Sequence, residues 1–168
     1  FDICKKFRKF NTHTPLILMG YYNLIFHYGV SKFINACEIS GVDGLIIVDL
    51  QPEEDPELLK ALKSTNIDLI RLITPTTNEG RLKTILKNAS GFLYYVTITG
   101  ITGQNSANLK ELKQSIINIK NKTKLPVVSG FGIKNREQVK KVCEISDGAV
   151  VGSSIVKIIE NNINNEDK

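Results

Sequence analysis

Short apolar runs alternate with longer amphipathic segments along the whole of this chain. The runs are near-continuous in hydrophobicity, which is typical of strands covered on both faces. They lie at residues 16–20, 44–49, 69–74, 91–97, 126–129 and 148–151. Because parallel strands need a long crossover connection, usually a helix, this rhythm predicts βα units and a parallel sheet. About six units occur, at the spacing of a (β/α)8 barrel.

Residues that start and stop helices stand between the runs. Gly41 fits a position just past a helix end, and Pro56 suits a first helical turn. Asn135, followed three residues later by Gln138, forms a capping-box pattern. The first ten residues have helical spacing as well, so we expect the chain to begin inside a helix.

Composition argues against several classes of protein. No stretch approaches the ~18 consecutive apolar residues of a membrane-spanning helix. The chain has 22 Lys and Arg against 17 Asp and Glu, a net charge of +5, but these charges are dispersed and have few aromatic residues between them. That pattern argues against a nucleic-acid groove.

The metal-binding residue types show no ligand spacing. We interpret Cys4, Cys37 and Cys143 as small buried apolar residues of a protein in a reducing, cytosol-like compartment. His13 and His27 have no matching Cys, His or acid, and we interpret them as surface or loop residues.

Two glycine-containing turns carry the strongest chemical signal. Gly130 and Gly132 follow the penultimate run, whereas Gly152 and Ser153 follow the last one, where a helix starts. Glycine lets the backbone approach an anion closely, and free N–H groups at a helix N-terminus bind phosphate. The loops after strands seven and eight are a recurrent phosphate site in barrels. We therefore favour a phosphate site over tight turns alone.

Other residues near the ends of runs leave alternatives open. The loop at 99–109 is either a lid over a site or a surface loop. Asp49 is the only carboxylate at the end of a run, whereas Glu53 and Glu54 fit the first turn of a helix and a structural role.

Two pairs of adjacent tyrosines lie in or directly after apolar runs. They are Tyr21 with Tyr22, and Tyr94 with Tyr95. Successive strand residues point to opposite faces, so we expect one tyrosine of each pair to point into the barrel.

Several motifs, in order and at the right spacing, resemble the α subunit of tryptophan synthase. The stretches are PLILMGYYNLIFHYG, GVDGLIIVDLQPEED, YYVTITGITG, SGFGIKNREQV and VVGSSIVKIIE. The resemblance implies a (β/α)8 barrel and a lyase that cleaves indole-3-glycerol phosphate to indole and glyceraldehyde 3-phosphate. It also implies a cytoplasmic or plastid-stromal α2β2 complex that makes tryptophan. By the same resemblance, indole would pass to the β subunit, which carries pyridoxal phosphate in that family, and the α subunit would have no cofactor or metal.

The resemblance also implies roles for particular residues. Backbone N–H groups around Gly103, Gly132, Gly152 and Ser153 would hold the substrate phosphate. Met19, Tyr21, Leu72, Tyr94 and Phe131 would line the indole pocket. Thr102 matches the lid threonine, and Asp49 lies in the region that faces the β subunit. Gln51 stands where many relatives have proline, which predicts a looser loop there.

The length of the chain limits what it is expected to do alone. A (β/α)8 barrel has about 250 residues, and this chain has 168. We expect residues 1–168 to form one barrel domain that is incomplete at both ends and contains strands 3 to 8. The reaction needs two positioned acid/base groups, which in the family are a Glu and an Asp whose segment would precede Phe1. We therefore assign no catalytic residue here and expect the chain alone to be inactive.

Two other functions are compatible with the glycine turns. One is a non-catalytic phosphate-binding subunit that regulates a β partner. The other is a different phosphate-binding barrel enzyme, such as a relative of thiamine-phosphate synthase or phosphoribosylanthranilate isomerase, although GYYN together with TGITG is not expected in those families.

Overall fold

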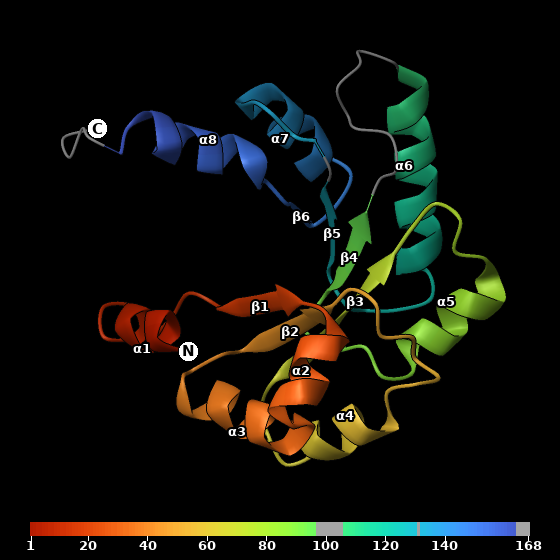
Figure 1. Cartoon of the computed structure of the whole chain (residues 1–168). Coiled ribbons are helices and arrows are strands. Elements are labelled where there is room, and N and C mark those ends of the chain that lie inside the picture. Colours follow the sequence, from red (N-terminus) through yellow and green to blue (C-terminus); the bar gives the residue numbers. More distant parts are fainter. Residues whose placement is uncertain (97–105, 131, 164–168) are drawn as a thin grey trace. The chain divides into compact units, whose positions relative to one another are not determined.

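The computed structural model of the chain describes residues 1–96, 106–130 and 132–163 (Figure 1). Its contacts divide the chain into two compact units. Unit 1 comprises residues 1–72 and 79–91, and unit 2 comprises residues 73–78 and 92–168. The expected single barrel domain over residues 1–168 stays a prediction, and the two units are described separately below.

The strands of unit 1 are parallel and follow chain order. They are β1 (Ile17–Gly20), β2 (Gly44–Ile47) and β3 (Asp68–Ile73), whose last residue belongs to unit 2. In the register, Met19 pairs with Ile46, which pairs with Ile70. Leu45 and Leu69 also pair, and they belong to the hydrophobic core cluster.

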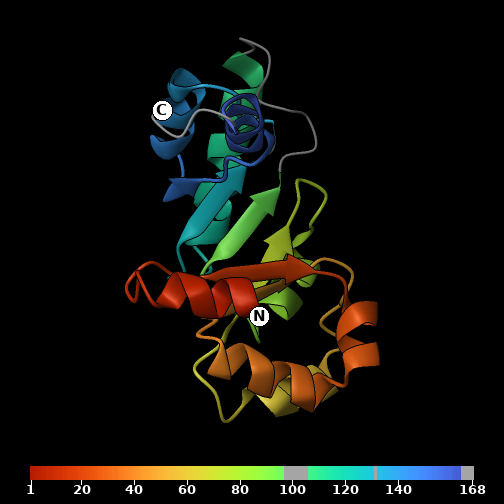
Figure 2. The same cartoon turned by 60° about the vertical axis from the view of Figure 1, so that its left-hand side comes forward.

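Helices cover the Leu45 face of these strands. The helices of unit 1 are α1 (Asp2–Arg8), α2 (Tyr22–Tyr28), α3 (Val30–Ile39), α4 (Pro56–Leu62) and α5 (Glu79–Leu86). Figures 1 and 2 show α3 and α4 side by side beneath the strands. Ile34 and Leu58 are fully buried in the core cluster with Leu45. Full burial of such side chains contributes about 1.5–3 kcal/mol each. Gly41 has φ +73° just past α3, as its helix-stop role requires.

Unit 2 repeats the parallel arrangement. Its strands are β4 (Leu93–Val96), β5 (Val127–Gly130) and β6 (Gly148–Ala149), paired in that order. Its helices are α6 (Ser106–Lys120), α7 (Arg136–Cys143) and α8 (Ser153–Asn161). All six predicted strands are therefore present, with ends shifted by a few residues from the apolar runs.

The predicted cap at the start of α7 is present, and the reciprocal bond of Gln138 goes to the backbone of Lys134, one residue before the N-cap. Asn135 accepts a hydrogen bond from the backbone N–H of Gln138 at 3.0 Å, and the Gln138 side chain accepts one from the backbone N–H of Lys134 at 2.7 Å. Asn135→Ala should lower the free energy of unfolding by about 1 kcal/mol, because a first-turn N–H loses its acceptor. Asn135→Asp keeps an acceptor and is the control. Equal stability of Asn135→Ala and wild type in urea unfolding would show that the cap contributes nothing.

Asp147 fastens the start of β6 to two neighbouring segments. Its Oδ1 contacts Lys120 Nζ at 2.6 Å, and its Oδ2 accepts a hydrogen bond from the Val127 backbone N–H at 2.8 Å. These contacts, the Lys120 hydrogen bond first and that from Val127 next, lower the pKa of Asp147. The folded state thus gains stability from the charged form, which is present above the unfolded pKa of about 4 and is lost as the pH falls through the folded pKa.

Asp147→Asn therefore has a pH-dependent effect on stability. At pH 7 we expect it to lower the free energy of unfolding by about 1 kcal/mol, because solvent screens part of the attraction in this half-exposed ion pair. The difference from wild type should shrink below about pH 4, where wild-type Asp147 also becomes neutral. Urea unfolding at both pH values measures it. A difference that does not change with pH would contradict this role of the charge.

Three sequence-based interpretations are wrong. Cys4 and Cys37 are buried, but Cys143 is exposed, because it ends α7 on the side away from the buried Val142. Glu53 and Glu54 precede α4, which begins only at Pro56. Tyr21 and Tyr22 are not strand residues, because β1 ends at Gly20; Tyr21 is the N-cap of α2, and Tyr22 is its first residue.

Candidate functional site

The turn after β6 has open space where an anion could approach the backbone. Gly152 is the N-cap of α8. The space beside its Cα is open, since an added Cβ would meet no atom within 4 Å. Its carbonyl accepts a hydrogen bond from the N–H of Ile155 at 2.9 Å, which starts the helix. The first N–H groups of a helix have no intrahelical acceptor, and Gly152 offers no side chain to cap them. Gly152 and Ser153 thus form an accessible helix N-terminus.

The turn after β5 is tied directly to this helix start. Ser154 Oγ donates a hydrogen bond to the Ile133 carbonyl at 2.9 Å, and Ile133 is buried. Gly132, the residue before it, has φ +70°, a backbone conformation that favours glycine. The structure therefore brings together Gly132, Gly152 and Ser153, the described residues of the predicted phosphate site.

Tyr94 lies on the face of unit 2 expected for a ligand-contacting residue. It pairs with Val128, which in turn pairs with Gly148. Tyr94 is half-buried, and burial raises the pKa of its hydroxyl. Tyr95 points to the opposite face and is 3% exposed. The alternation expected for this tyrosine pair is therefore present.

In unit 1, the predicted pocket residues share one face of the strands. Met19 and Leu72 lie on the same side as Ile46 and Ile70, opposite the face covered by helices. Met19 is 60% exposed and Tyr21, directly after β1, is 58% exposed. Large apolar side chains at the carboxyl end of a parallel strand suit contact with a flat apolar ligand.

Asp49 has a structural contact that the sequence did not indicate. Its Oδ1 accepts a hydrogen bond from the Tyr22 backbone N–H at 2.8 Å, so it holds the first turn of α2. The Val48 N–H donates to the Gly20 carbonyl at 3.0 Å, which continues the β1–β2 pairing up to this point. Asp49 is exposed and lies at the start of the connection from β2 to α4.

Sequence reasoning missed two arginines that contact this connection. Arg71 of β3 forms a buried ion pair with Asp55. Arg81 of α5 contacts Glu53 and Gln51. Gln51, expected to loosen the loop, thus gives it a side-chain contact. The one available signal was the charged residue inside the otherwise apolar stretch LIRLI.

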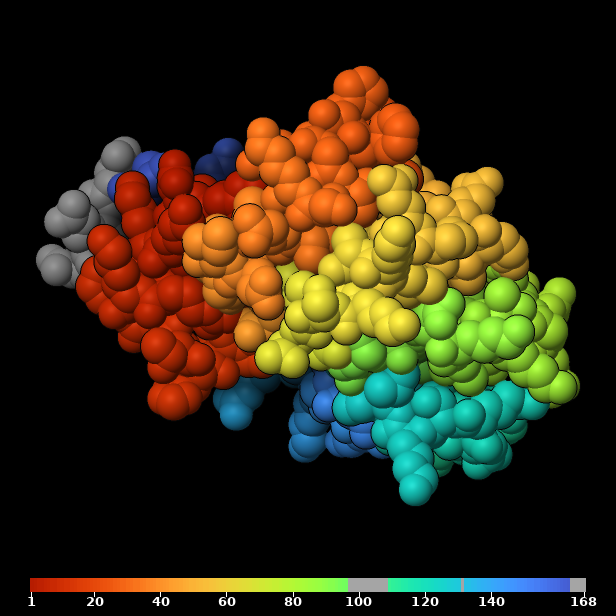
Figure 3. All heavy atoms as spheres, turned by 90° about the horizontal axis from the view of Figure 1, so that it is seen from below, coloured from red at the N-terminus to blue at the C-terminus, as the bar shows by residue number. Residues whose placement is uncertain are grey.

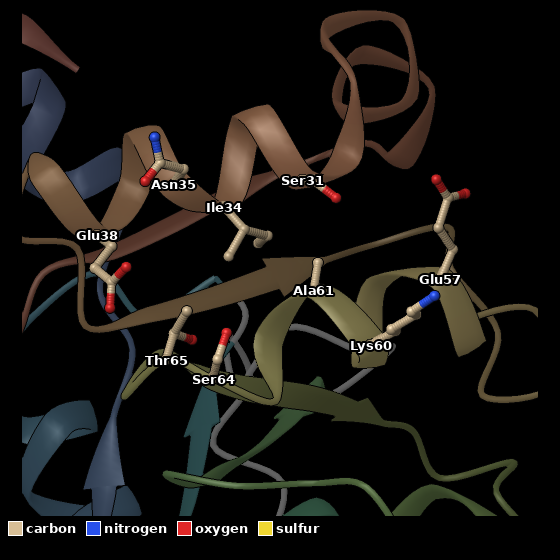
Figure 4. A pocket seen from close by; sticks show the side chains of 9 residues that line it. All are labelled: Ser31, Ile34, Asn35, Glu38, Glu57, Lys60, Ala61, Ser64 and Thr65. Atoms are coloured by element: carbon tan, nitrogen blue, oxygen red, sulfur yellow. The ribbon is translucent and has the colours of Figure 1, made fainter.

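A cavity of about 480 Å³ lies elsewhere in unit 1, in the groove between α3 and α4 (Figures 3 and 4). It is lined by polar side chains such as Glu38, Glu57 and Lys60, and by none of the predicted site residues. The Tyr22 hydroxyl donates to Glu57 Oε2 at 3.5 Å, and burial, followed by the Glu57 charge, raises the pKa of Tyr22. We find no reason to place the site there.

Three predicted site residues, Thr102, Gly103 and Phe131, lie outside the described residues. In the part of the chain that the structure describes, no group of three or more His, Cys, Asp or Glu side chains could hold a metal ion. Across the same residues, no helix is long and apolar enough to cross a membrane.

Parallel βα units with a glycine turn at a helix N-terminus define a βα protein whose backbone geometry, where its last strands end, suits an anionic ligand. The family model described as tryptophan synthase alpha chain matches residues 1–168. The chain belongs to this family. This membership excludes the alternative that the chain belongs to a different family of phosphate-binding barrel enzymes.

Solved structures agree with this assignment. A tryptophan synthase subunit alpha from Legionella pneumophila str. Paris is 36% identical with a TM-score of 0.86, over 99% of this chain and 61% of that one. The subunit from Campylobacter jejuni is 38% identical (TM-score 0.85), over 95% and 64%. A structure of the α2β2 complex from Pyrococcus furiosus is 36% identical (TM-score 0.84), over 95% and 64%. This confirms the predicted fold class, six βα units of a (β/α)8 barrel. The chain spans about three fifths of the length of these relatives.

Proposed function

We propose that the full-length protein containing this chain is the lyase subunit that cleaves indole-3-glycerol phosphate and passes indole to a pyridoxal-phosphate-dependent β subunit. The observation that carries the proposal is the pair of glycine turns after β5 and β6, joined by the Ser154–Ile133 hydrogen bond. Membership of the family supplies the reaction and the partner. The free cysteines accord with a reducing compartment such as the cytoplasm.

The phosphate is the part of the substrate that these turns suit. Backbone N–H groups near Gly132, Gly152 and Ser153, together with Gly103, would bind its oxygens, and the positive end of the α8 dipole favours the negative charge. Such contacts do not change during the reaction, so they serve to position the substrate.

The indole ring requires apolar surface at the other end of the substrate. We assign this contact to Met19, Tyr21, Leu72, Tyr94 and Phe131. Thr102 would act in the lid, and Asp49 would face the β subunit.

The chemical step is a retro-aldol cleavage. The bond between indole C3 and the first glycerol carbon breaks, C3 takes up a proton, and the hydroxyl on that glycerol carbon loses its proton to give the aldehyde. The indole N–H shares its proton during this step, so two acid/base groups are needed. The proposal assigns substrate binding to this chain and acid/base catalysis to none of its residues.

Indole release from indole-3-glycerol phosphate by the full-length protein, with and without the β subunit, tests the proposal. We expect turnover in both cases and faster turnover with the β subunit. No turnover with the β subunit present would refute lyase function. Binding of the β subunit without turnover would instead favour the regulatory role.

A further inference from the structure

The inference concerns Arg71, a charged residue in the middle of β3. Its side chain is only 6% exposed, and its neighbours Ile70 and Ile73 are fully buried. Burial lowers the pKa of Arg71, since desolvation disfavours the charged form. A buried guanidinium requires specific partners, and those partners show what the residue does.

Both partners of Arg71 belong to the connection between β2 and α4, defined here as the 49–55 loop. Its Nη1 donates a hydrogen bond to the Leu50 carbonyl at 3.3 Å, near the start of the loop. Its Nη2 forms an ion pair with Asp55, whose side chain is 1% exposed, at the loop's end. One side chain therefore holds both ends of the loop.

Asp55 occupies a position that would ordinarily give it another role. It is the N-cap residue of α4, yet its side chain makes no capping hydrogen bond to that helix. An N-cap aspartate usually accepts from a first-turn N–H. Here the carboxylate pairs with Arg71, so the contact joins the loop to β3 and does not serve the helix.

Arg81 adds a more exposed pair of contacts to the same loop. It contacts Gln51, and its Nη1 lies 2.5 Å from Glu53 Oε1, in a pair whose side chains are 31% and 55% exposed. The loop thus displays Gln51 and Glu53 to solvent between its two buried contact residues, and Asp49 just before them. Because exposed ion pairs contribute little, the buried Arg71 contacts dominate.

We infer that Arg71 and Asp55 are positioning residues that set the shape of the 49–55 loop for docking of the β subunit. The inference rests on the proposed function, in which Asp49 faces that subunit. A loop that is already ordered loses less conformational entropy on binding. The contacts of Arg71 with Leu50 and Asp55 therefore strengthen association with the β subunit without touching substrate.

The test uses the full-length protein and the β subunit from the same organism, with Kd measured by calorimetry. Arg71→Met should raise the Kd at least about tenfold, because the loop must then be ordered on binding. Arg71→Lys keeps a charge opposite Asp55 but has a single ammonium group, so it should fold while losing the Leu50 contact and raising the Kd. Arg81→Met should have a smaller effect.

Arg8→Met is the matched control. Arg8 makes a comparable set of contacts at the opposite end of β2, donating to the Gly41 carbonyl at 2.7 Å and pairing with Asp43. It should lower thermal stability and leave the Kd within about twofold of wild type. Hydrogen exchange should become faster at the amides of residues 50–55 in Arg71→Met and remain unchanged there in Arg8→Met.

The double variant Arg71→Met/Asp55→Leu separates positioning from stability alone. Removing both buried charges should restore thermal stability but not affinity, since nothing then holds the Leu50 carbonyl. Recovery of affinity in the double variant, or an unchanged Kd in Arg71→Lys, would overturn this inference but leave the proposed function standing. A wild-type protein that does not bind the β subunit would overturn the proposed partner, and the inference with it.

Discussion

Gly152→Asp in the full-length protein should raise the KM for indole-3-glycerol phosphate by about 100-fold, since a like charge placed against a bound anion costs several kcal/mol. The fold should tolerate the change. An added Cβ would meet no atom within 4 Å, and the φ of Gly152 is negative, at −113°. Aspartate at an N-cap also stabilises a helix. The variant therefore separates substrate binding from stability, and steady-state kinetics together with thermal unfolding measure both.

Gly152→Asn is the matched control for this prediction. Asparagine has nearly the same size and also caps helices, but it has no charge. We expect its KM to rise clearly less than that of Gly152→Asp. Equal KM values for the two variants would mean that no anionic group of the substrate lies at the start of α8.

Among the variants with predicted stability effects, Asp55→Ala should lower the free energy of unfolding most, by about 3–5 kcal/mol. It leaves a buried guanidinium without its counter-charge. Arg71 has little access to water, and its Nε makes no hydrogen bond within the described part of the chain. The remaining contact, to the Leu50 carbonyl, cannot balance a full charge. Urea unfolding of the full-length protein measures this loss.

Glu137→Ala tests whether burial, rather than ion pairing as such, causes the Asp55 effect. Glu137 pairs with Lys141 at 2.8 Å on the surface of α7, and their side chains are 75% and 45% exposed. This variant should not change stability measurably. Similar losses in Glu137→Ala and Asp55→Ala would show that the burial argument is wrong.

The sequence predicted what depends on local pattern. The strands follow from the apolar runs, and the start of α7 follows from Asn135 and Gln138, which lie three residues apart. Gly132 and Gly152 stand where the pattern placed them, because a turn between a strand and a helix is also a local feature.

Contacts between distant positions could not be predicted in the same way. Ser154 and Ile133 are 21 positions apart, as are Arg71 and Leu50, and no spacing rule relates them. The exposure of Cys143 was missed because helical periodicity gives an approximate face, while its neighbour Val142 takes the buried position.

The binding of substrate phosphate by the two linked glycine turns is the central claim, and amide NMR of the full-length protein tests it most directly. On titration with glyceraldehyde 3-phosphate, the product that keeps the phosphate and is not cleaved further, we predict that the backbone N–H resonances of Gly132, Gly152 and Ser153 shift together with a single Kd. In Gly152→Asp, the same concentrations should produce no shift. Saturable shifts elsewhere, with these three resonances unmoved, would contradict the claim.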